Sequence, residues 1–192
     1  MICLIKLREG IVPRRVNCVE DLSLTFIMEV LSNHRTVPNK TKSAFDPVED
    51  ALVEIAKGNM VIVTDDESRE NEGDLIMAAS KATPEAVAFM IRHTSGILCA
   101  PLLEEQAGSL HLDPMVARND APMSTAFTVS IDYKKGLTTG ISAEERAATV
   151  QALTNSNVAA EDFVRPGHIF PLVSRKGGVL VRSGHTEAGT DL

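Results

Sequence analysis

Several features that many proteins use are missing from this sequence. It contains no tryptophan and one tyrosine, and only 4% of its residues are aromatic, so its core must consist mainly of aliphatic side chains. No apolar run approaches the roughly 20 residues that a membrane-spanning helix needs. The apolar start is interrupted by Lys6 and Arg8, which is untypical of a secretory signal peptide. We therefore expect no membrane segment and a cytoplasmic protein, or a plastid protein if the source is a plant.

Cysteine and several common motifs are also scarce or absent. Cys3, Cys18 and Cys99 form no CxxC pair and no zinc-type spacing, so free thiols in a reducing compartment are the simplest interpretation. The chain lacks the Gly-rich phosphate loop, the dinucleotide-binding fingerprint, and the zinc-protease and serine-hydrolase motifs. These absences argue against the enzyme classes that depend on those motifs.

The chain has fewer basic than acidic residues. The chain has 26 acidic residues against 19 lysines and arginines, a net charge of −7, which argues against sequence-independent binding of nucleic acid. A small anionic substrate remains compatible with this charge, because a local pocket can be basic on an acidic protein. Hydrophobic residues, by contrast, make up 44% of the chain, and there is no low-complexity block. Most of the 192 residues should therefore fold, with one ordinary domain as the expectation.

The chain divides near residues 40–43. Residues 1–43 are a leader of unknown role, either disordered or containing one helix over 20–31, and residues 44–192 form the candidate domain. Asp46 with Glu49, and Ser142 with Glu145, have the spacing of capping boxes that open helices, and Gly58 is a stop signal. Another helix is predicted from Thr83 onward. Strands are predicted over 60–63, 75–79, 97–102, 127–131, 169–173 and 179–181, the last two joined by a hairpin turn at Gly177 and Gly178. Because helices and strands alternate irregularly, we expect an α+β fold with a mixed β-sheet and helices packed on it.

The most informative segment is an acidic loop between two apolar strands. Residues 65–74 contain six acids in ten positions, and Arg69 lies among them. Clustered carboxylates repel one another unless a cation relieves them, and Mg²⁺ prefers oxygen ligands. The alternative is a solvated charged turn, since charged residues mostly face water.

A second cluster is residues 165–172, where Pro166 and Gly167 predict a tight turn between Arg165 and His168. Arginine suits phosphate because its planar fork donates two parallel hydrogen bonds, and histidine can bind a metal ion or move protons. A surface turn before a strand is the competing interpretation.

Three weaker signals follow. Residues 184–188 add another histidine and carboxylate. Residues 138–142 offer hydroxyls and backbone N–H groups at a helix start, which could bind phosphate or simply cap the helix. Cys99 lies in an apolar run, where a lone cysteine is usually a small core residue.

Taken together, five segments resemble the consecutive signatures of one family. Residues 65–76, 92–99, 136–142, 165–172 and 178–188 look like those of the 3,4-dihydroxy-2-butanone 4-phosphate synthases, in the family's order, and the match covers about Phe45 to Leu192. The family continues beyond Leu192, so the resemblance implies a C-terminally truncated domain. The chain could also be the front part of a fusion with GTP cyclohydrolase II, a pairing common in this family.

The resemblance implies a Mg²⁺- or Mn²⁺-dependent lyase of riboflavin biosynthesis. It would convert D-ribulose 5-phosphate to 3,4-dihydroxy-2-butanone 4-phosphate and formate, as a homodimer with active sites near the subunit interface. The implied metal ligands are Glu70 and His168, and Asp74, Cys99 and Glu187 would be catalytic. The implied substrate-binding residues are Arg69, Glu70, Asp74, Thr139, Arg165, Pro166, Gly167, His168, Ile169 and Glu187.

The chemistry explains why these residue types occur together. The sugar phosphate must lose a proton beside its carbonyl, and a metal ion on the carbonyl and a neighbouring hydroxyl lowers the cost of the resulting charge. A carboxylate must then pass protons; which one takes the first proton stays open. Two other functions compete: a different Mg²⁺-dependent enzyme acting on a phosphorylated sugar, and a non-catalytic truncated relative that binds a sugar phosphate or a full-length partner.

Overall fold

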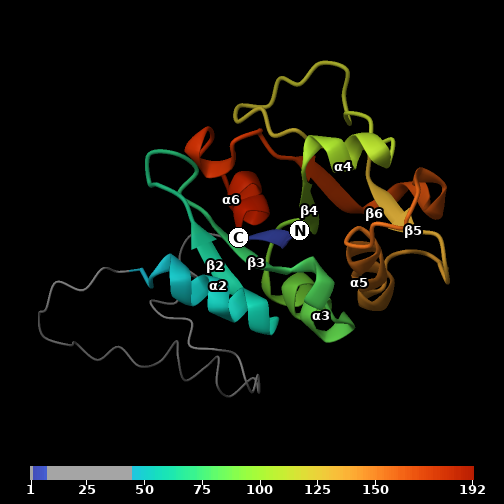
Figure 1. Cartoon of the computed structure of the whole chain (residues 1–192), viewed down its shortest axis with the longest axis horizontal. Coiled ribbons are helices and arrows are strands. Elements are labelled where there is room, and N and C mark those ends of the chain that lie inside the picture. The colour runs from blue at the N-terminus through green and yellow to red at the C-terminus, as the bar shows by residue number, and fades with distance from the viewer. Residues whose placement is uncertain (1, 8–44) are drawn as a thin grey trace, which may run out of the picture.

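The computed structural model describes residues 2–7 and 45–192 of the chain, arranged as Figure 1 shows. The predicted helix over 20–31 therefore lies outside the described residues. The helices are α2 (Val48–Lys57), α3 (Pro84–His93), α4 (Glu104–Ser109), α5 (Ala143–Ala152) and α6 (His185–Asp191), with short 3-10 helices η1 (Ala79–Lys81), η2 (Ala160–Asp162) and η3 (Gly178–Leu180). The strands are β1 (Ile2–Leu7), β2 (Val61–Thr64), β3 (Gly73–Ala78), β4 (Cys99–Leu102), β5 (Ile131–Tyr133) and β6 (Phe163–Val173).

The strands form one mixed sheet in the order β2-β3-β1-β4-β6-β5. Only β4 and β6 pair in parallel; the other neighbours are antiparallel. The predicted α+β fold with a mixed sheet is therefore confirmed. Strand β1 was not predicted from the sequence; it lies between β3 and β4 and joins the two halves of the sheet.

Each face of the sheet is covered by its own helices. On one face, Leu75 and Ile169 pack with residues of α3 and α5 such as Met90 and Val150, all of them buried. On the other face, a smaller cluster includes Ile76, Ile55 of α2 and Leu192, the residue that follows α6. The side chains are almost all aliphatic, as the lack of aromatic residues requires, and burying each contributes about 1.5–3 kcal/mol. Among the described residues, every helix falls short of the length and apolarity that a membrane crossing requires.

Two of the predicted helix signals are confirmed in atomic detail. The Thr83 hydroxyl accepts a hydrogen bond from the backbone N–H of Ala86 at the start of α3. Gly58 ends α2 with φ of 93°, a left-handed conformation that glycine adopts without a steric cost. The Asp46 capping box is wrong, because Pro47 occupies the N-cap position and no side chain caps the helix.

The predicted strand over 179–181 and its hairpin are also wrong. Gly177 and Gly178 both have positive φ, and the chain continues into the 3-10 helix η3. The carboxylate of Asp191 in α6 accepts the Val179 N–H, which holds η3 against that helix. The expected strand over 127–131 is mostly irregular, since only isolated bridges form at Phe127 and Thr128 before β5 begins.

Candidate functional site

The sheet register places two predicted site residues on one face, at one end. Because β1 is antiparallel to both β3 and β4, and β4 is parallel to β6, strands β3, β4 and β6 run in the same direction. Pairing through β1 puts Ile76, Cys99 and Phe170 in one row across the sheet. Asp74 and His168 each precede that row by two residues, so they point to the same face. Three strand spacings separate them, about 14 Å.

The acidic loop leads into this end of the sheet, and Asp65 organises it. The Asp65 carboxylate accepts hydrogen bonds from the backbone N–H groups of Glu70 and Glu72 and from the Arg69 guanidinium. Burial raises the pKa of Asp65, but these hydrogen bonds and the nearby His185 together hold it below its usual value. The loop is thus a folded unit built on one carboxylate, rather than a freely solvated turn.

Arg69 neutralises two of the loop's acids. Its Nη1 lies 2.7 Å from an Asp65 oxygen and 3.1 Å from a Glu70 oxygen. Ligand atoms of Asp65, Glu70 and His185 all lie within 4.8 Å of one another, a spacing that could hold a metal ion. Because the guanidinium already sits beside both carboxylates, it would have to move for an ion to bind there.

His185 connects this loop to α6. Its side chain is 6% exposed, and Nδ1 lies 3.8 Å from an oxygen of buried Asp74. Figure 1 shows the β2–β3 loop beside the C-terminal part of the chain, in agreement with these contacts. The predicted cluster at 184–188 therefore lies next to the acidic loop, although the sequence analysis assigned His185 no role.

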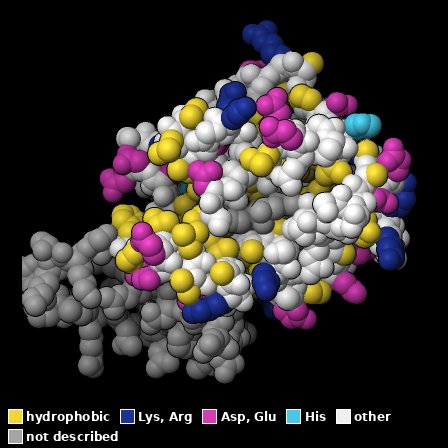
Figure 2. All heavy atoms as spheres, in the orientation of Figure 1, with side chains coloured by type: hydrophobic (Ala, Val, Ile, Leu, Met, Phe, Trp, Pro, Cys, Tyr) yellow, Lys and Arg dark blue, Asp and Glu magenta, His cyan; other side chains and the backbone are white. Residues whose placement is uncertain are grey.

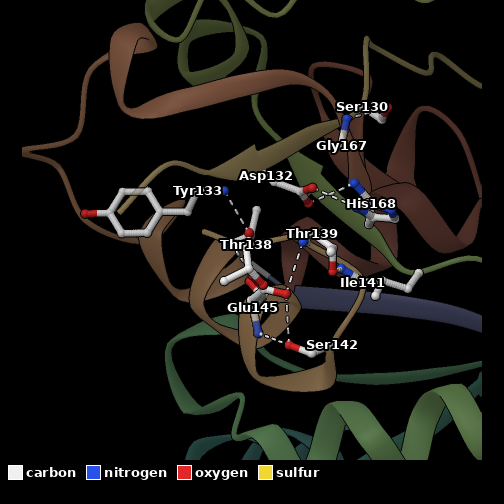
Figure 3. Close-up of polar contacts among 12 residues, drawn as sticks. Ser130, Asp132, Tyr133, Thr138, Thr139, Ile141, Ser142, Glu145, Gly167 and His168 are labelled. Carbon is white, nitrogen blue, oxygen red and sulfur yellow. Dashed lines mark hydrogen bonds and ion pairs between the residues drawn. The ribbon is translucent and has the colours of Figure 1, made fainter. Parts of the chain in front are cut away.

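Residues 165–168 form a bulge rather than a turn before a strand. Two consecutive residues of β5, Ile131 and Asp132, pair with Ile169 and Val164 of β6, so the four residues between have no partners in β5. The Arg165–Pro166 peptide bond in this bulge is cis. The Asp132 carboxylate accepts the backbone N–H of His168 at 2.8 Å and lies 2.7 Å from its Nδ1 (Figure 3). The Asp132 side chain thus accepts a backbone N–H that has no partner in the strand ladder.

Arg165 makes contacts that the sequence did not suggest. Its guanidinium donates to the backbone carbonyls of Ala160, Phe163 and Leu110. These three bonds tie the start of β6 to η2 and to the end of α4. Contact between Arg165 and a phosphate stays a prediction. Only the N–H groups of the Arg165 guanidinium that are not used in these three bonds could make it.

The predicted phosphate-binding loop over 138–142 is held by an internal carboxylate. Glu145 accepts hydrogen bonds from the backbone N–H groups of Thr138 and Gly140 and from the Thr138 and Ser142 hydroxyls (Figure 3). Ser142 in turn accepts the Glu145 N–H and caps α5 as predicted. The backbone bond from Thr138 is the largest cause that lowers the pKa of Glu145, to about 2. Phosphate binding by Thr139 stays a prediction.

Glu187 is the most deeply buried acid of the site, with its side chain 1% exposed. Its two oxygens accept hydrogen bonds from the Arg182 guanidinium at 2.6 Å and the Arg175 backbone N–H at 2.9 Å. A side chain at Gly184 would overlap this ion pair, so the two charged groups would have to shift to admit one. Arg182 was not predicted as a site residue, because it follows the apolar residues 179–181 and has no distinctive spacing. The geometry holds the 175–182 segment on α6, and a catalytic role for Glu187 stays a prediction.

Cys99 is 6% exposed and belongs to the cluster that includes Ile76 and Leu172. Its Sγ lies 3.7 Å from the carbonyl oxygen of Ile97. The thiol therefore lies in the core beneath the site, and a catalytic role for it also stays a prediction.

On the face drawn in Figure 2, lysine and arginine side chains are scattered rather than gathered in one basic surface.

Comparisons with known proteins agree on one family. Residues 49–192 match a family model described as 3,4-dihydroxy-2-butanone 4-phosphate synthase. The chain is 56% identical over 148 residues to riboflavin biosynthesis protein RibBA of Nocardia farcinica, an alignment covering 77% of this chain and 36% of that protein. It is 50% identical over 179 residues to the probable bifunctional riboflavin biosynthesis protein RIBA 2, chloroplastic, of rice, covering 92% of this chain and 32% of that protein. Because this alignment covers 92% of the chain, it extends into the residues before Phe45, which the sequence motifs did not connect to the family.

Solved structures give the same result. A crystal structure of 3,4-dihydroxy-2-butanone 4-phosphate synthase in complex with two magnesium ions is 49% identical, with a TM-score of 0.74 over 76% of this chain and 68% of that one. The Candida albicans enzyme of the same name is 49% identical, with a TM-score of 0.70 over 77% of this chain and 72% of that one. The chain spans about a third of the length of the curated relatives that it matches.

Proposed function

Since this chain belongs to the 3,4-dihydroxy-2-butanone 4-phosphate synthase family, we propose that its domain converts D-ribulose 5-phosphate to 3,4-dihydroxy-2-butanone 4-phosphate and formate. This lyase reaction would serve riboflavin biosynthesis, the process named in its relatives. The observation that supports the proposal is that Asp74 and His168 lie on the same face and at the same end of the sheet, about 14 Å apart, beside the acidic loop. A cytoplasmic or plastid location stays a prediction.

We propose that Glu70 and His168 hold the divalent cation, Mg²⁺ or Mn²⁺. His168 fits this role because Asp132 occupies Nδ1, which leaves Nε2 as the nitrogen for a metal ion. Glu70 fits because it is a carboxylate on a loop at the same end of the sheet, but in this structure it is paired with Arg69. When bound, the ion would polarise the substrate's carbonyl and stabilise negative charge on it. Binding by both residues requires the β2–β3 loop to move toward β6.

The remaining residues have roles set by their surroundings. Asp74 is buried beside His185, so it can exchange a proton with a sugar hydroxyl while shielded from bulk water. Arg69 carries the positive charge of the loop, and once Glu70 turns toward an ion this charge can meet the substrate. Glu187, bound to Arg182, would act on the substrate only if that pair opened. We propose a homodimer as the working form, with the substrate as its small-molecule partner.

The test is formate release from ribulose 5-phosphate in the presence of Mg²⁺. We expect formate from the wild-type protein and at least a hundredfold less from Glu70→Ala and His168→Ala. Glu67→Ala is the matched control, because Glu67 is an exposed acid of the same loop, and it should retain near wild-type activity. Equal formate from all four proteins would refute the ligand assignment. Substrate consumption without formate would instead indicate a different reaction on the same sugar phosphate.

A further inference from the structure

Asp132 makes two hydrogen bonds to one residue. Its side chain is 4% exposed, Oδ1 accepts the backbone N–H of His168 at 2.8 Å, and Oδ2 lies 2.7 Å from the ring nitrogen Nδ1. An ionised carboxylate has no proton to donate, so the bond to a neutral ring requires the proton on Nδ1. The geometry therefore selects one of the two tautomers of His168, the one in which Nε2 carries a lone pair.

The bulge in β6 creates this contact. Four residues of β6 have no partner in β5, and two backbone N–H groups there donate instead to side chains of β5 and of the residue before it. Gly167 donates to the Ser130 hydroxyl at 3.1 Å, and His168 donates to Asp132 (Figure 3). Gly167 lies so close to the backbone of β5 that a side chain would overlap Ile131 and Asp132. The strand pairing, rather than any local sequence feature, brings the carboxylate to the imidazole.

The loop over 138–142 covers the same pair from the other side. A side chain at Gly140 would overlap Oδ2 of Asp132 and Nδ1 of His168, and its φ of 80° also favours glycine. Glu145 holds this loop in place by accepting the Gly140 N–H. The hydrogen bond between the carboxylate and the ring is thus enclosed by the loop, which limits the rotation of the ring.

We propose that Asp132 is a positioning residue that keeps the proton of His168 on Nδ1 and directs the Nε2 lone pair to a divalent cation. This inference rests on the proposed role of His168 as a metal ligand. Histidines that bind metal ions commonly donate their other ring N–H to a carboxylate, and losing that partner typically lowers metal affinity about 10–100-fold.

Asp132→Asn separates this role from simple support of the bulge. The Asn carbonyl can still accept the His168 backbone N–H, but its amide would donate to Nδ1 and drive the ring proton to Nε2. Ser130→Ala is the structural control, because it removes the acceptor of the Gly167 N–H and leaves the carboxylate in place. Asp120→Asn is the matched chemical control at an exposed position.

The tautomer is read from the ¹⁵N shifts of the His168 ring in metal-free protein at about pH 9. Mn²⁺ affinity is measured in parallel by electron paramagnetic resonance. We expect the Nδ1–H form in the wild type and both controls, and the Nε2–H form in Asp132→Asn with Mn²⁺ affinity reduced about 10–100-fold.

An Nε2–H ring in the wild type would overturn the proposal, whether or not the variant folds. So would an unchanged tautomer, or Mn²⁺ affinity within twofold of the wild type, in a folded Asp132→Asn protein. His168→Ala separates the two proposals. If this variant binds Mn²⁺ as tightly as the wild type, His168 is not the metal ligand. The metal site of the proposed function is then refuted, and so is the directing role of Asp132. The ring spectrum still reports whether Asp132 selects the tautomer.

Discussion

Removing the Arg182 side chain should destabilise the domain more than any exposed substitution nearby. Arg182→Met removes the guanidinium that is paired with the Glu187 carboxylate, whose side chain is 1% exposed. Breaking a buried ion pair from one side costs about 3–5 kcal/mol. The carboxylate keeps the Arg175 N–H, and the Arg182 side chain is 22% exposed, so we expect the low end, about 3 kcal/mol.

Urea unfolding followed by far-UV circular dichroism measures this loss, since the chain has no tryptophan to report by fluorescence. With a slope of about 1–3 kcal/mol/M for small proteins, the midpoint should fall by roughly 1–3 M. Arg175→Met is the matched control. Its side chain is exposed, and it contacts Glu187 through its backbone N–H, so its effect should stay within about 0.5 kcal/mol.

A double-mutant cycle with Glu187→Gln identifies the source of the effect. If the pair acts as a unit, the double variant should be more stable than the sum of the two single losses by about 1.5 kcal/mol or more. An Arg182→Met loss no larger than that of Arg175→Met would refute the reasoning, because the pair would then behave like a solvent-exposed ion pair.

Two further predictions concern Glu145 and the arrangement of the metal ligands. The pKa of Glu145 is lowered from 4.5 to about 2, so its hold on the 138–142 loop should be complete above about pH 4.5 and weaken as the pH falls toward 2; a carboxyl NMR titration with a midpoint near 4.5 would contradict this. Glu70 lies on the loop that leads into β3, at the end of the sheet where β6 also begins, so we expect both ligands to come from one chain. Coexpressed Glu70→Ala and His168→Ala protomers should then form no active dimers, and substantial recovered formate release would show that the ligands come from different chains.

Local patterns predicted much of the fold because their physics is local. The Thr83 cap and the Gly58 stop depend on a few adjacent residues, and both appear as predicted. The prediction at Gly177 and Gly178 failed because a glycine pair permits several turns. Here the contact between Asp191 and the Val179 N–H favours a 3-10 helix over a hairpin. No pattern in residues 1–43 predicted β1, since its place in the sheet depends on pairing with β3, some seventy positions along the chain.

By itself, the sequence determined the family and the residue types of the site, because the acidic loop and the 165–172 segment are continuous and their side chains have distinctive chemistry. Only the tertiary structure decided which side chains meet. Asp132 reaches His168 across 36 positions because the register of β5 and β6 places a bulge between them, and Arg182 meets Glu187 because η3 folds back on α6. Hydrogen bonds and ion pairs act over a few ångströms, so their partners are set by how strands and helices pack and cannot be read from spacing along the chain.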